Sequence, residues 1–197
     1  MDERDLDPDP LRQFQRWFAE ARHAGLAAPE AMALATATPE GRPSVRMVLL
    51  KSADERGFDF YTHYESRKGR ELAANPRAAL LFHWEPLGRQ ARVEGRVGRI
   101  PTGESEAYFG TRPLESRLAA WASPQSSPLA SRDELERLYA DVETRFPGDE
   151  VPLPPHWGGF RLEPDAYEFW QHGDNRLHDR VRYELADGVW RRARLAP

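Results

Sequence analysis

The pattern of apolar positions predicts one amphipathic helix near the start of the chain. Asp9 followed by Pro10 is a typical helix start, and Gly25 is a typical stop. The apolar residues between them recur at helical spacing: Leu11, Phe14, Trp17, Phe18 and Ala21. Residues 1–9, before this helix, are acidic and contain proline, so we expect them to form a flexible tail.

After residue 30 the pattern changes to short apolar runs that are separated by turn residues. The expected strands are 31–37, 45–50, 58–62, 78–84, 90–100, 160–162, 167–171, 181–185 and 189–191. Shorter helices are expected at 66–75, at 102–112, at 114–121 and after a capping box of Ser131 and Glu134. This spacing favours an antiparallel barrel over β-α-β units, which means a mainly β fold with flanking helices, of the α+β class. No repeat or long linker divides the chain, so residues 1–197 are expected to form a single domain.

Composition and charge exclude several classes of function. The chain has 197 residues, a formal net charge of -4 and no cysteine. A duplex-binding domain normally carries a basic excess, so no nucleic-acid partner is expected. The absence of cysteine excludes disulfides, thiolate catalysis and cysteine-based zinc sites. No apolar run reaches transmembrane length and the acidic start does not resemble a signal peptide, so we expect no membrane partner and a cytoplasmic location.

Three further observations concern individual residue types and motifs. The six histidines show no helical ligand pairing, so no metal site is expected. No nucleophile elbow is present, which leaves a Ser-His-Asp hydrolase unsupported. Of the 28 Lys and Arg residues only Lys51 and Lys68 are lysines. One interpretation is that both occupy positions where a compact ammonium suits a ligand better than a planar guanidinium does; taken alone, chance is the simpler explanation.

Two clusters of cations accompany the first strands. Arg46 and Lys51 lie at the two ends of an apolar strand, where ordinary charged strand ends are the simpler interpretation. Tyr61 and Thr62 are followed by Ser66-Arg67-Lys68 at the start of a predicted helix. A helix N-terminus with a hydroxyl and two cations is a good anion site, and a solvated basic turn explains the pattern equally well.

A second candidate anion site follows in the next helical segment. Tyr108 and Arg112 are four residues apart and therefore share a helical face, and Ser116 follows after a proline. A phenol, a guanidinium and a hydroxyl can together hold a phosphate. Taken alone, a helix with one surface arginine is the simpler interpretation.

The densest constellation lies near the C-terminus. Residues 168–171 read Glu-Phe-Trp-Gln and precede Arg176, His178 and Arg180. If this segment is extended, these three side chains point to the same face. Two cations beside an imidazole favour an anion or an electron-rich ring there, and histidine transfers protons near neutral pH. We prefer this functional interpretation to arginine–aspartate pairing on an exposed strand.

These segments together resemble the pyridoxamine (pyridoxine) 5′-phosphate oxidase family along nearly the whole chain, from about Asp9 to Pro197. The most specific match is residues 168–180. The other segments agree in order and spacing: 46–51, 66–68, Gln125-Ser126-Ser127, Trp157-Gly158-Gly159-Phe160 and Arg194-Leu195-Ala196-Pro197.

The resemblance implies an FMN-binding split β-barrel of the antiparallel Greek-key type that forms a homodimer with FMN at the subunit interface. The FMN contacts it implies are Arg46, Met47, Val48, Leu49, Leu50, Lys51, Tyr61, Thr62, Arg67, Lys68, Gln90, Gln125, Ser126, Trp170 and Arg180. The residues it implies for the substrate are Lys51, Tyr108, Arg112 and Ser116 at the phosphate, and Arg176 and His178 at the pyridine ring, where they are also the expected catalytic residues.

The implied reaction is the oxidation of pyridoxamine or pyridoxine 5′-phosphate to pyridoxal 5′-phosphate. The 4′ carbon of the substrate gives a hydride to N5 of FMN, and oxygen then reoxidises the flavin to yield hydrogen peroxide. Many members carry an Arg-Arg-Glu-Tyr-like segment over the substrate, whereas this chain starts Met1-Asp2-Glu3-Arg4. Substrate affinity and choice are therefore left open, and His172 stands where glycine is common.

Two alternatives remain open. One is a related FMN oxidase of the phenazine-biosynthesis type, which acts on an unphosphorylated tricyclic substrate and would leave the Tyr108, Arg112 and Ser116 cluster without a purpose. The other is a non-enzymatic module that binds flavin or pyridoxal phosphate, since one fold hosts many functions. The pair of Arg176 and His178 favours an enzyme.

Overall fold

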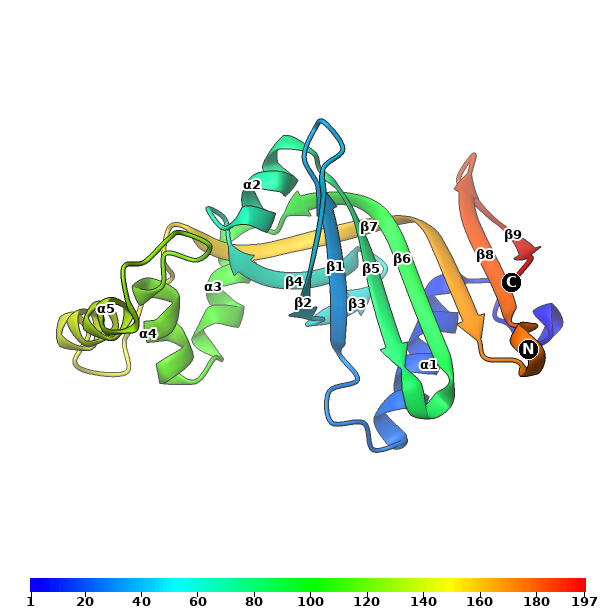
Figure 1. The fold of residues 1–197 in the computed structure, drawn as a ribbon, viewed down its shortest axis with the longest axis horizontal. Coiled ribbons are helices and arrows are strands. Elements are labelled where there is room, and N and C mark those ends of the chain that lie inside the picture. Colours follow the sequence, from blue (N-terminus) through cyan, green and yellow to red (C-terminus); the bar gives the residue numbers. More distant parts are fainter.

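A computed structural model describes residues 1–197. One antiparallel sheet curls into a half-barrel with helices around it (Figure 1). The strands are β1 (Ala31–Ala37), β2 (Pro43–Leu49), β3 (Ser52–Asp54), β4 (Gly57–His63), β5 (Arg77–Trp84), β6 (Arg89–Arg99), β7 (Trp157–Gln171), β8 (Asp179–Ala186) and β9 (Val189–Leu195). The helices are η1 (Glu3–Asp5), α1 (Pro10–His23), α2 (Arg67–Ala74), η2 (Glu85–Leu87), α3 (Thr102–Gly110), α4 (Leu114–Ala122), α5 (Arg132–Arg145) and η3 (Asp174–Arg176).

The strand order is β2-β1-β5-β6-β7-β4-β3, and β8 and β9 extend the sheet from β7. In Figure 1, α4 and α5 lie at one end of the molecule, and β8, β9 and both termini lie at the other. This arrangement confirms the predicted mainly β fold with flanking helices. No helix is both long and apolar enough to span a bilayer.

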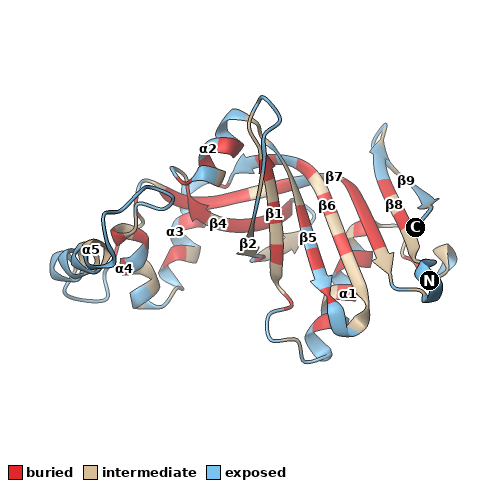
Figure 2. Ribbon diagram, viewed as in Figure 1, coloured by how far each residue is buried: buried red, intermediate tan, exposed pale blue.

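The main core lies between α1 and the concave side of the sheet. Asp9 caps α1 by accepting a hydrogen bond from the backbone amide of Leu11. The buried face of the helix places Phe14 with its ring centroid 4.8 Å from that of Phe58 and 4.9 Å from that of Phe82. The same strands turn alternate residues outward, and Figure 2 shows buried and exposed positions alternating along β5.

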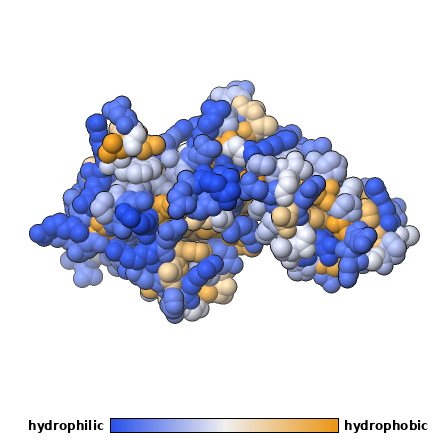
Figure 3. All heavy atoms as spheres, turned by 180° about the vertical axis from the view of Figure 1, so that it is seen from behind, coloured by the Kyte–Doolittle hydropathy of each residue, from blue (hydrophilic) through white to orange (hydrophobic).

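A smaller core packs α3 and α4 against the start of β7. It contains Phe109, Leu118 and Trp157. Strand β7 runs from this small core to the main core, and therefore fixes the position of the helical end relative to the barrel. Behind the sheet the surface is mostly hydrophilic, with apolar residues in scattered patches (Figure 3).

The two strands predicted at 160–162 and 167–171 are wrong as separate elements, because they form the single strand β7. The proline at 164 interrupts the apolar pattern without ending the strand. The register between β6 and β7 shifts between Glu94 and Gly95, opposite Pro164, and a bulge of this kind accommodates a residue without an N–H. A side chain at Gly95 would lie 2.0 Å from the Glu163 carbonyl oxygen, so this crossing requires glycine.

The first nine residues are packed in the structure, in contrast to the flexible tail that we expected. Leu6 is 4% exposed and belongs to the main core. The Tyr183 hydroxyl donates to the Asp7 carbonyl oxygen at 2.9 Å, and the N-terminal ammonium of Met1 contacts Asp179. A single leucine among acidic residues carries too little periodicity to predict this packing.

Candidate active site

One group of candidate residues surrounds the N-terminus of α2. The Ser66 side chain caps this helix by accepting a hydrogen bond from the Gly69 amide at 3.3 Å. The Lys68 ammonium donates to Thr62 Oγ1 at 3.0 Å and to Gln125 Oε1 at 2.6 Å. Burial, together with the charge of Arg46, lowers the pKa of Lys68 to about 8.

Lys68 has no carboxylate among its contacts, so nothing in the chain neutralises its charge. The structure thus brings together Thr62, Lys68 and Gln125, three of the predicted cofactor contacts, from β4, α2 and the loop before α5. The neighbouring Ser126 is exposed and has a left-handed backbone with φ of 73°. A half-buried ammonium at a helix N-terminus, surrounded by neutral donors and acceptors, is suited to bind an anion.

Two arginines predicted for the same site converge on Glu71, a residue that we did not predict. Arg67 Nε donates to Glu71 Oε1 at 2.9 Å, and Arg46 Nη2 lies 3.3 Å from Glu71 Oε2. Glu71 is 6% exposed. Its spacing of four residues from Arg67 on one helix was the available sequence signal, but the long-range partner Arg46 gave none.

The remaining residues of the segment 46–51 differ in exposure, because successive side chains of β2 point to opposite faces of the sheet. Met47 and Leu49 are 64% and 44% exposed, and Val45 on the same side is 68% exposed. Val48 is half-buried, Leu50 is buried and Lys51 is exposed. Because β2 is an edge strand that pairs only with β1, this apolar row lies on the surface of the isolated chain.

A second group of candidate residues forms an aromatic stack on α3 and β4. The Tyr61 and Tyr108 rings stack with centroids 4.0 Å apart, and the Tyr61 and Trp157 centroids are 5.5 Å apart. The Lys51 ammonium lies 5.8 Å from the Tyr108 ring centroid. Burial raises the pKa of the Tyr61 phenol to about 12, so this tyrosine stays neutral.

Arg112 lies beside this stack with no acidic partner. Its guanidinium carbon is 4.6 Å from the Trp157 ring centroid, and its Nη1 atom is buried without any hydrogen-bond partner. Burial lowers the pKa of Arg112. Ser116 lies four residues further on, in the first turn of α4. A guanidinium that lacks a carboxylate partner is a candidate group for binding an anionic ligand. Trp157, which holds the guanidinium in place, was not among our predicted site residues.

The third group lies on β6, β7 and β8. Trp170 pairs with Gln90 on one side and with Arg180 on the other. All three residues line a hollow of about 230 Å³. Arg180 Nη2 lies 2.8 Å from Glu168 Oε1, and the other oxygen of Glu168 binds Arg92. Glu168 therefore fixes Arg180, a role that the sequence analysis did not assign to it.

The expectation of an extended segment through Arg176, His178 and Arg180 is wrong. Residues 174–176 form the short helix η3, and φ of Arg176 is 63°, so alternation does not align the three side chains. His178 nevertheless lies beside Trp170, with ring centroids 4.7 Å apart. Its Nδ1 accepts a hydrogen bond from the Gly173 amide at 3.2 Å, so the neutral ring carries its proton on Nε2.

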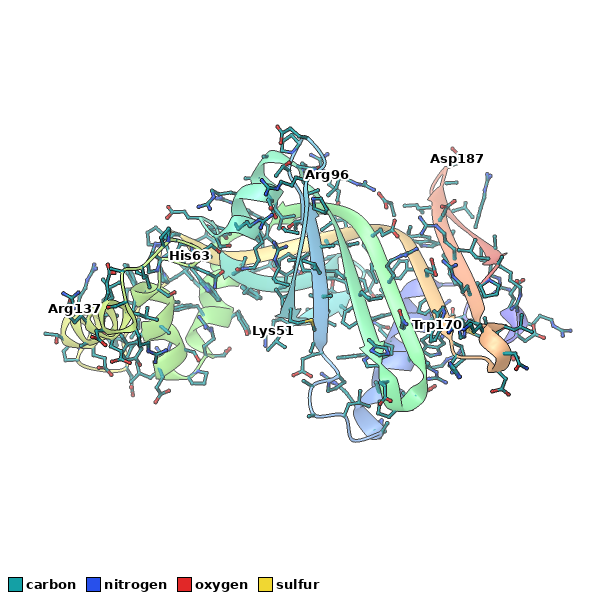
Figure 4. The ribbon with its side chains drawn as sticks, viewed as in Figure 1. Lys51, His63, Arg96, Arg137, Trp170 and Asp187 are labelled. Carbon is teal, nitrogen blue, oxygen red and sulfur yellow. The ribbon has the colours of Figure 1, made fainter.

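The predicted site residues form two separate sets in the chain. Lys51 lies near the middle of the molecule and Trp170 lies at the end of β7, toward the termini (Figure 4). No hydrogen bond or ion pair joins the groups around Lys68 and Arg112 to the group around Trp170.

Comparison with known proteins agrees with this geometry. Residues 18–146 match the family model for pyridoxamine 5′-phosphate oxidase, and residues 157–197 match the model for the pyridoxine 5′-phosphate oxidase C-terminal dimerisation region. The chain is 62% identical over 191 residues to the pyridoxine/pyridoxamine 5′-phosphate oxidase of Rubrobacter xylanophilus, covering 97% of this chain and 88% of that protein. It is 56% identical to the corresponding protein of Cupriavidus taiwanensis, covering 100% of this chain and 93% of that protein.

Solved structures show the same fold. PhzG from Burkholderia lata 383, in complex with tetrahydrophenazine-1-carboxylic acid, superposes with a TM-score of 0.92 at 36% identity, covering 98% of this chain and 95% of that chain. A pyridoxamine 5′-phosphate oxidase-related, FMN-binding protein from Nostoc punctiforme has a TM-score of 0.76 at 18% identity, covering 98% of this chain and 100% of that chain. The matches over both parts of the chain show that it belongs to the pyridoxamine 5′-phosphate oxidase family.

Proposed function

We propose that the protein is a cytoplasmic, FMN-dependent oxidase that converts pyridoxamine or pyridoxine 5′-phosphate to pyridoxal 5′-phosphate, with oxygen as the acceptor and hydrogen peroxide as the second product. The observation that carries this proposal is a pair of cations, Lys68 and Arg112, neither of which has an acidic partner. The cofactor and the substrate each carry one phosphate. The two groups meet along β4, where Tyr61 contacts one and Thr62 contacts the other.

The residues around α2 fit the phosphate of FMN. Lys68, Thr62 and Gln125 supply a half-buried ammonium, a hydroxyl and an amide. Arg67 uses only Nε to bind Glu71, so its two Nη groups are free to bind the phosphate. Those donors suit the phosphate dianion of FMN, because no carboxylate occupies the site beside Lys68. When bound, FMN supplies the hydride acceptor of the reaction. Met47, Val48, Leu49 and Leu50 would contact it along β2, and Ser126 beside Gln125.

The residues around Arg112 fit the phosphate of the substrate. Arg112, Lys51, Tyr108 and Ser116 would hold it, which fixes one end of the substrate and leaves its ring to be oriented by Arg176 and His178. The backbone bond at Nδ1 leaves His178 Nε2–H as a donor to a ring oxygen or nitrogen of the substrate. Holding the reacting groups in one geometry is the main contribution that these residues make to the rate.

The two sets of residues come from different subunits in the proposed homodimer. The dimerisation region matches residues 157–197, which hold Trp170, Arg176, His178 and Arg180, and the exposed apolar row of β2 supplies surface for the contact. One protomer would then contribute the α2 group and its partner the Trp170 group.

Mixed dimers test this arrangement. Lys68→Met and Arg180→Met variants are each expected to be inactive, and random mixing after dissociation should restore about a quarter of wild-type activity, because half of the dimers then contain one intact site. Recovery of no activity from mixed, refolded subunits would refute a site shared between protomers, provided that refolded wild type regains its activity.

The proposed reaction is tested by the phosphate dependence of product formation. Purified protein loaded with FMN should form pyridoxal 5′-phosphate and hydrogen peroxide in equal amounts from pyridoxine 5′-phosphate. Unphosphorylated pyridoxine, which cannot engage Arg112, should show a KM raised by roughly 100-fold or more, because a charged ligand group lost at a buried arginine removes a charge-assisted bond and leaves the guanidinium unpaired. Equal KM values for the two substrates would contradict the phosphate assignment.

The similarity to PhzG supports a second candidate function, that of a phenazine-type oxidase. That protein was solved with tetrahydrophenazine-1-carboxylic acid at 36% identity to this chain. The carboxylate of such a substrate could pair with Arg112, but it offers fewer acceptor oxygens than a phosphate to the group of Arg112, Lys51, Tyr108 and Ser116, so this function is the second candidate. Faster flavin reduction by a reduced phenazine carboxylic acid than by either B6 phosphate would reverse the order of the two proposals. Binding of FMN without reduction by either substrate class would favour the non-enzymatic module.

A further inference from the structure

The Glu71 carboxylate connects three elements that carry candidate cofactor residues. It lies on α2 and is buried, and it accepts hydrogen bonds from Thr36 on β1 at 2.5 Å and from Ser44 on β2 at 2.6 Å. Arg46 of β2 and Arg67 of α2 donate to it as well. One buried acid thus ties the β1–β2 hairpin to the helix whose N-terminus holds Lys68.

The surrounding donors keep Glu71 ionised. Burial by itself raises the pKa of a carboxyl group, but the hydrogen bonds from Ser44, Thr36, Arg67 and Arg46 outweigh burial and lower the pKa of Glu71 to about 2. Both carboxylate oxygens are engaged: Oε1 by Arg67, and Oε2 by the two hydroxyls and Arg46. A charged acid with this many donors holds its partners in one geometry.

The two arginines are left with different capacities for a ligand. The Nη groups of Arg46 donate to four acceptors: Leu34 O, Thr36 Oγ1, Ser44 Oγ and Glu71 Oε2. Arg67 uses only Nε for its bond to Glu71, so both of its Nη groups remain for a ligand. Its side chain is 52% exposed, and without Glu71 its long stem has several rotamers available.

We propose that Glu71 is a positioning residue for the cofactor phosphate site, where it fixes Arg46 against the hairpin and aims the free face of Arg67 at the phosphate bound by Lys68. This inference rests on the proposed binding of FMN and adds a residue that need not touch the cofactor. The guanidinium of Arg46 then acts mainly through its charge and its support of the hairpin, and Arg67 supplies the direct contacts.

Electrostatics and positioning predict opposite effects for loss of this carboxylate. Glu71 is an anion close to the proposed site of another anion, so removing its charge strengthens phosphate binding if charge alone matters. If Glu71 acts by positioning, its removal releases Arg67 and weakens phosphate binding. The sign of the change therefore separates the two roles.

The decisive experiment measures FMN and riboflavin binding to the apoprotein by flavin fluorescence quenching, for wild type and Glu71→Gln. Riboflavin lacks the phosphate, so it reports any general damage to the flavin site. The expected result is a dissociation constant for FMN raised roughly tenfold or more, the range for loss of charge-assisted contacts, with riboflavin affinity unchanged. Unchanged or tighter FMN binding would overturn the inference.

Two further variants test whether the effect is specific to Glu71 or follows from the loss of any buried acid or from misfolding. Asp59 forms another buried ion pair, with Arg161 at 2.7 Å, and neither residue is among the proposed cofactor contacts. Asp59→Asn should therefore leave the ratio of FMN to riboflavin affinity unchanged. Ser44→Ala removes one donor to Glu71 with little risk to folding and should weaken FMN binding in the same direction by a smaller factor. If Glu71→Gln does not fold, an FMN affinity for Ser44→Ala equal to wild type overturns the inference by itself. Failure of the wild-type protein to bind FMN would instead refute the proposed function.

Discussion

Proton uptake at Lys68 provides a quantitative test of the cofactor phosphate site. Burial and the charge of Arg46 lower the pKa of this lysine from its usual 10.5 to about 8 in the free protein. A bound phosphate supplies the missing counter-charge and should return the pKa toward 10.5. FMN binding is then coupled to the protonation of Lys68, and the affinity must fall as the pH rises above the pKa of the free protein.

The size of the effect follows from the two pKa values. If the pKa is about 8 in the free protein and 10.5 in the complex, the dissociation constant for FMN rises about tenfold between pH 7 and pH 9. The sign is fixed because the free protein loses the Lys68 proton in this window and the complex keeps it. Riboflavin, which lacks a phosphate, should bind equally well at both pH values.

Fluorescence titrations of the apoprotein at pH 7, 8 and 9 provide the assay. The matched control is Lys68→Arg, because a guanidinium stays protonated throughout this range and its FMN affinity should therefore be independent of pH. If the FMN affinity of the wild type is constant from pH 7 to 9, FMN binding is not coupled to protonation of Lys68. A pH dependence that the arginine variant retains would assign the effect to another group.

Four further predictions concern other parts of the site. Arg112→Ala should raise KM for pyridoxine 5′-phosphate by roughly 10- to 100-fold with FMN affinity unchanged, and an unchanged KM would contradict the phosphate clamp. Arg176→Leu should lower kcat far more than FMN affinity; equal turnover in steady-state assays would remove its catalytic role. The pKa of Glu71 lies below its unfolded value, so its stabilisation is present above about pH 4.5 and is lost as the pH falls toward 2; denaturant titrations should show a smaller loss over that range for Glu71→Gln. Met47→Glu should place a charge in the apolar row of β2 and give a monomer by sedimentation, whereas an intact dimer would place the interface elsewhere.

Local sequence signals were sufficient for most elements of the fold. Asp9 and Ser66 do cap the helices predicted after them, and the alternation of Met32, Leu34 and Thr36 matches a strand with one buried face. The signals failed where a long-range contact decides the structure. Strand β7 continues through Pro164 because of the bulge opposite Gly95, and no local pattern specifies that partner.

The candidate site was predicted from residue type and from family resemblance, and its supporting residues were missed. Lys68 and Gln125 are 57 positions apart, and only the fold shows that they share a hydrogen bond. The sequence analysis assigned no site role to Glu71 or Trp157, because their partners Arg46 and Arg112 come from distant segments. The direct ligand contacts of all site residues stay predictions until tested.

The most direct test of the proposed oxidase is anaerobic reduction of the flavin by substrate. Protein loaded with FMN is mixed without oxygen with pyridoxamine 5′-phosphate, and separately with pyridoxine 5′-phosphate, while the absorbance of oxidised flavin is recorded. An oxidase of this kind should show bleaching with either or both substrates, return of the absorbance on admission of air, and formation of pyridoxal 5′-phosphate. Bound flavin that neither substrate reduces would contradict the proposed function.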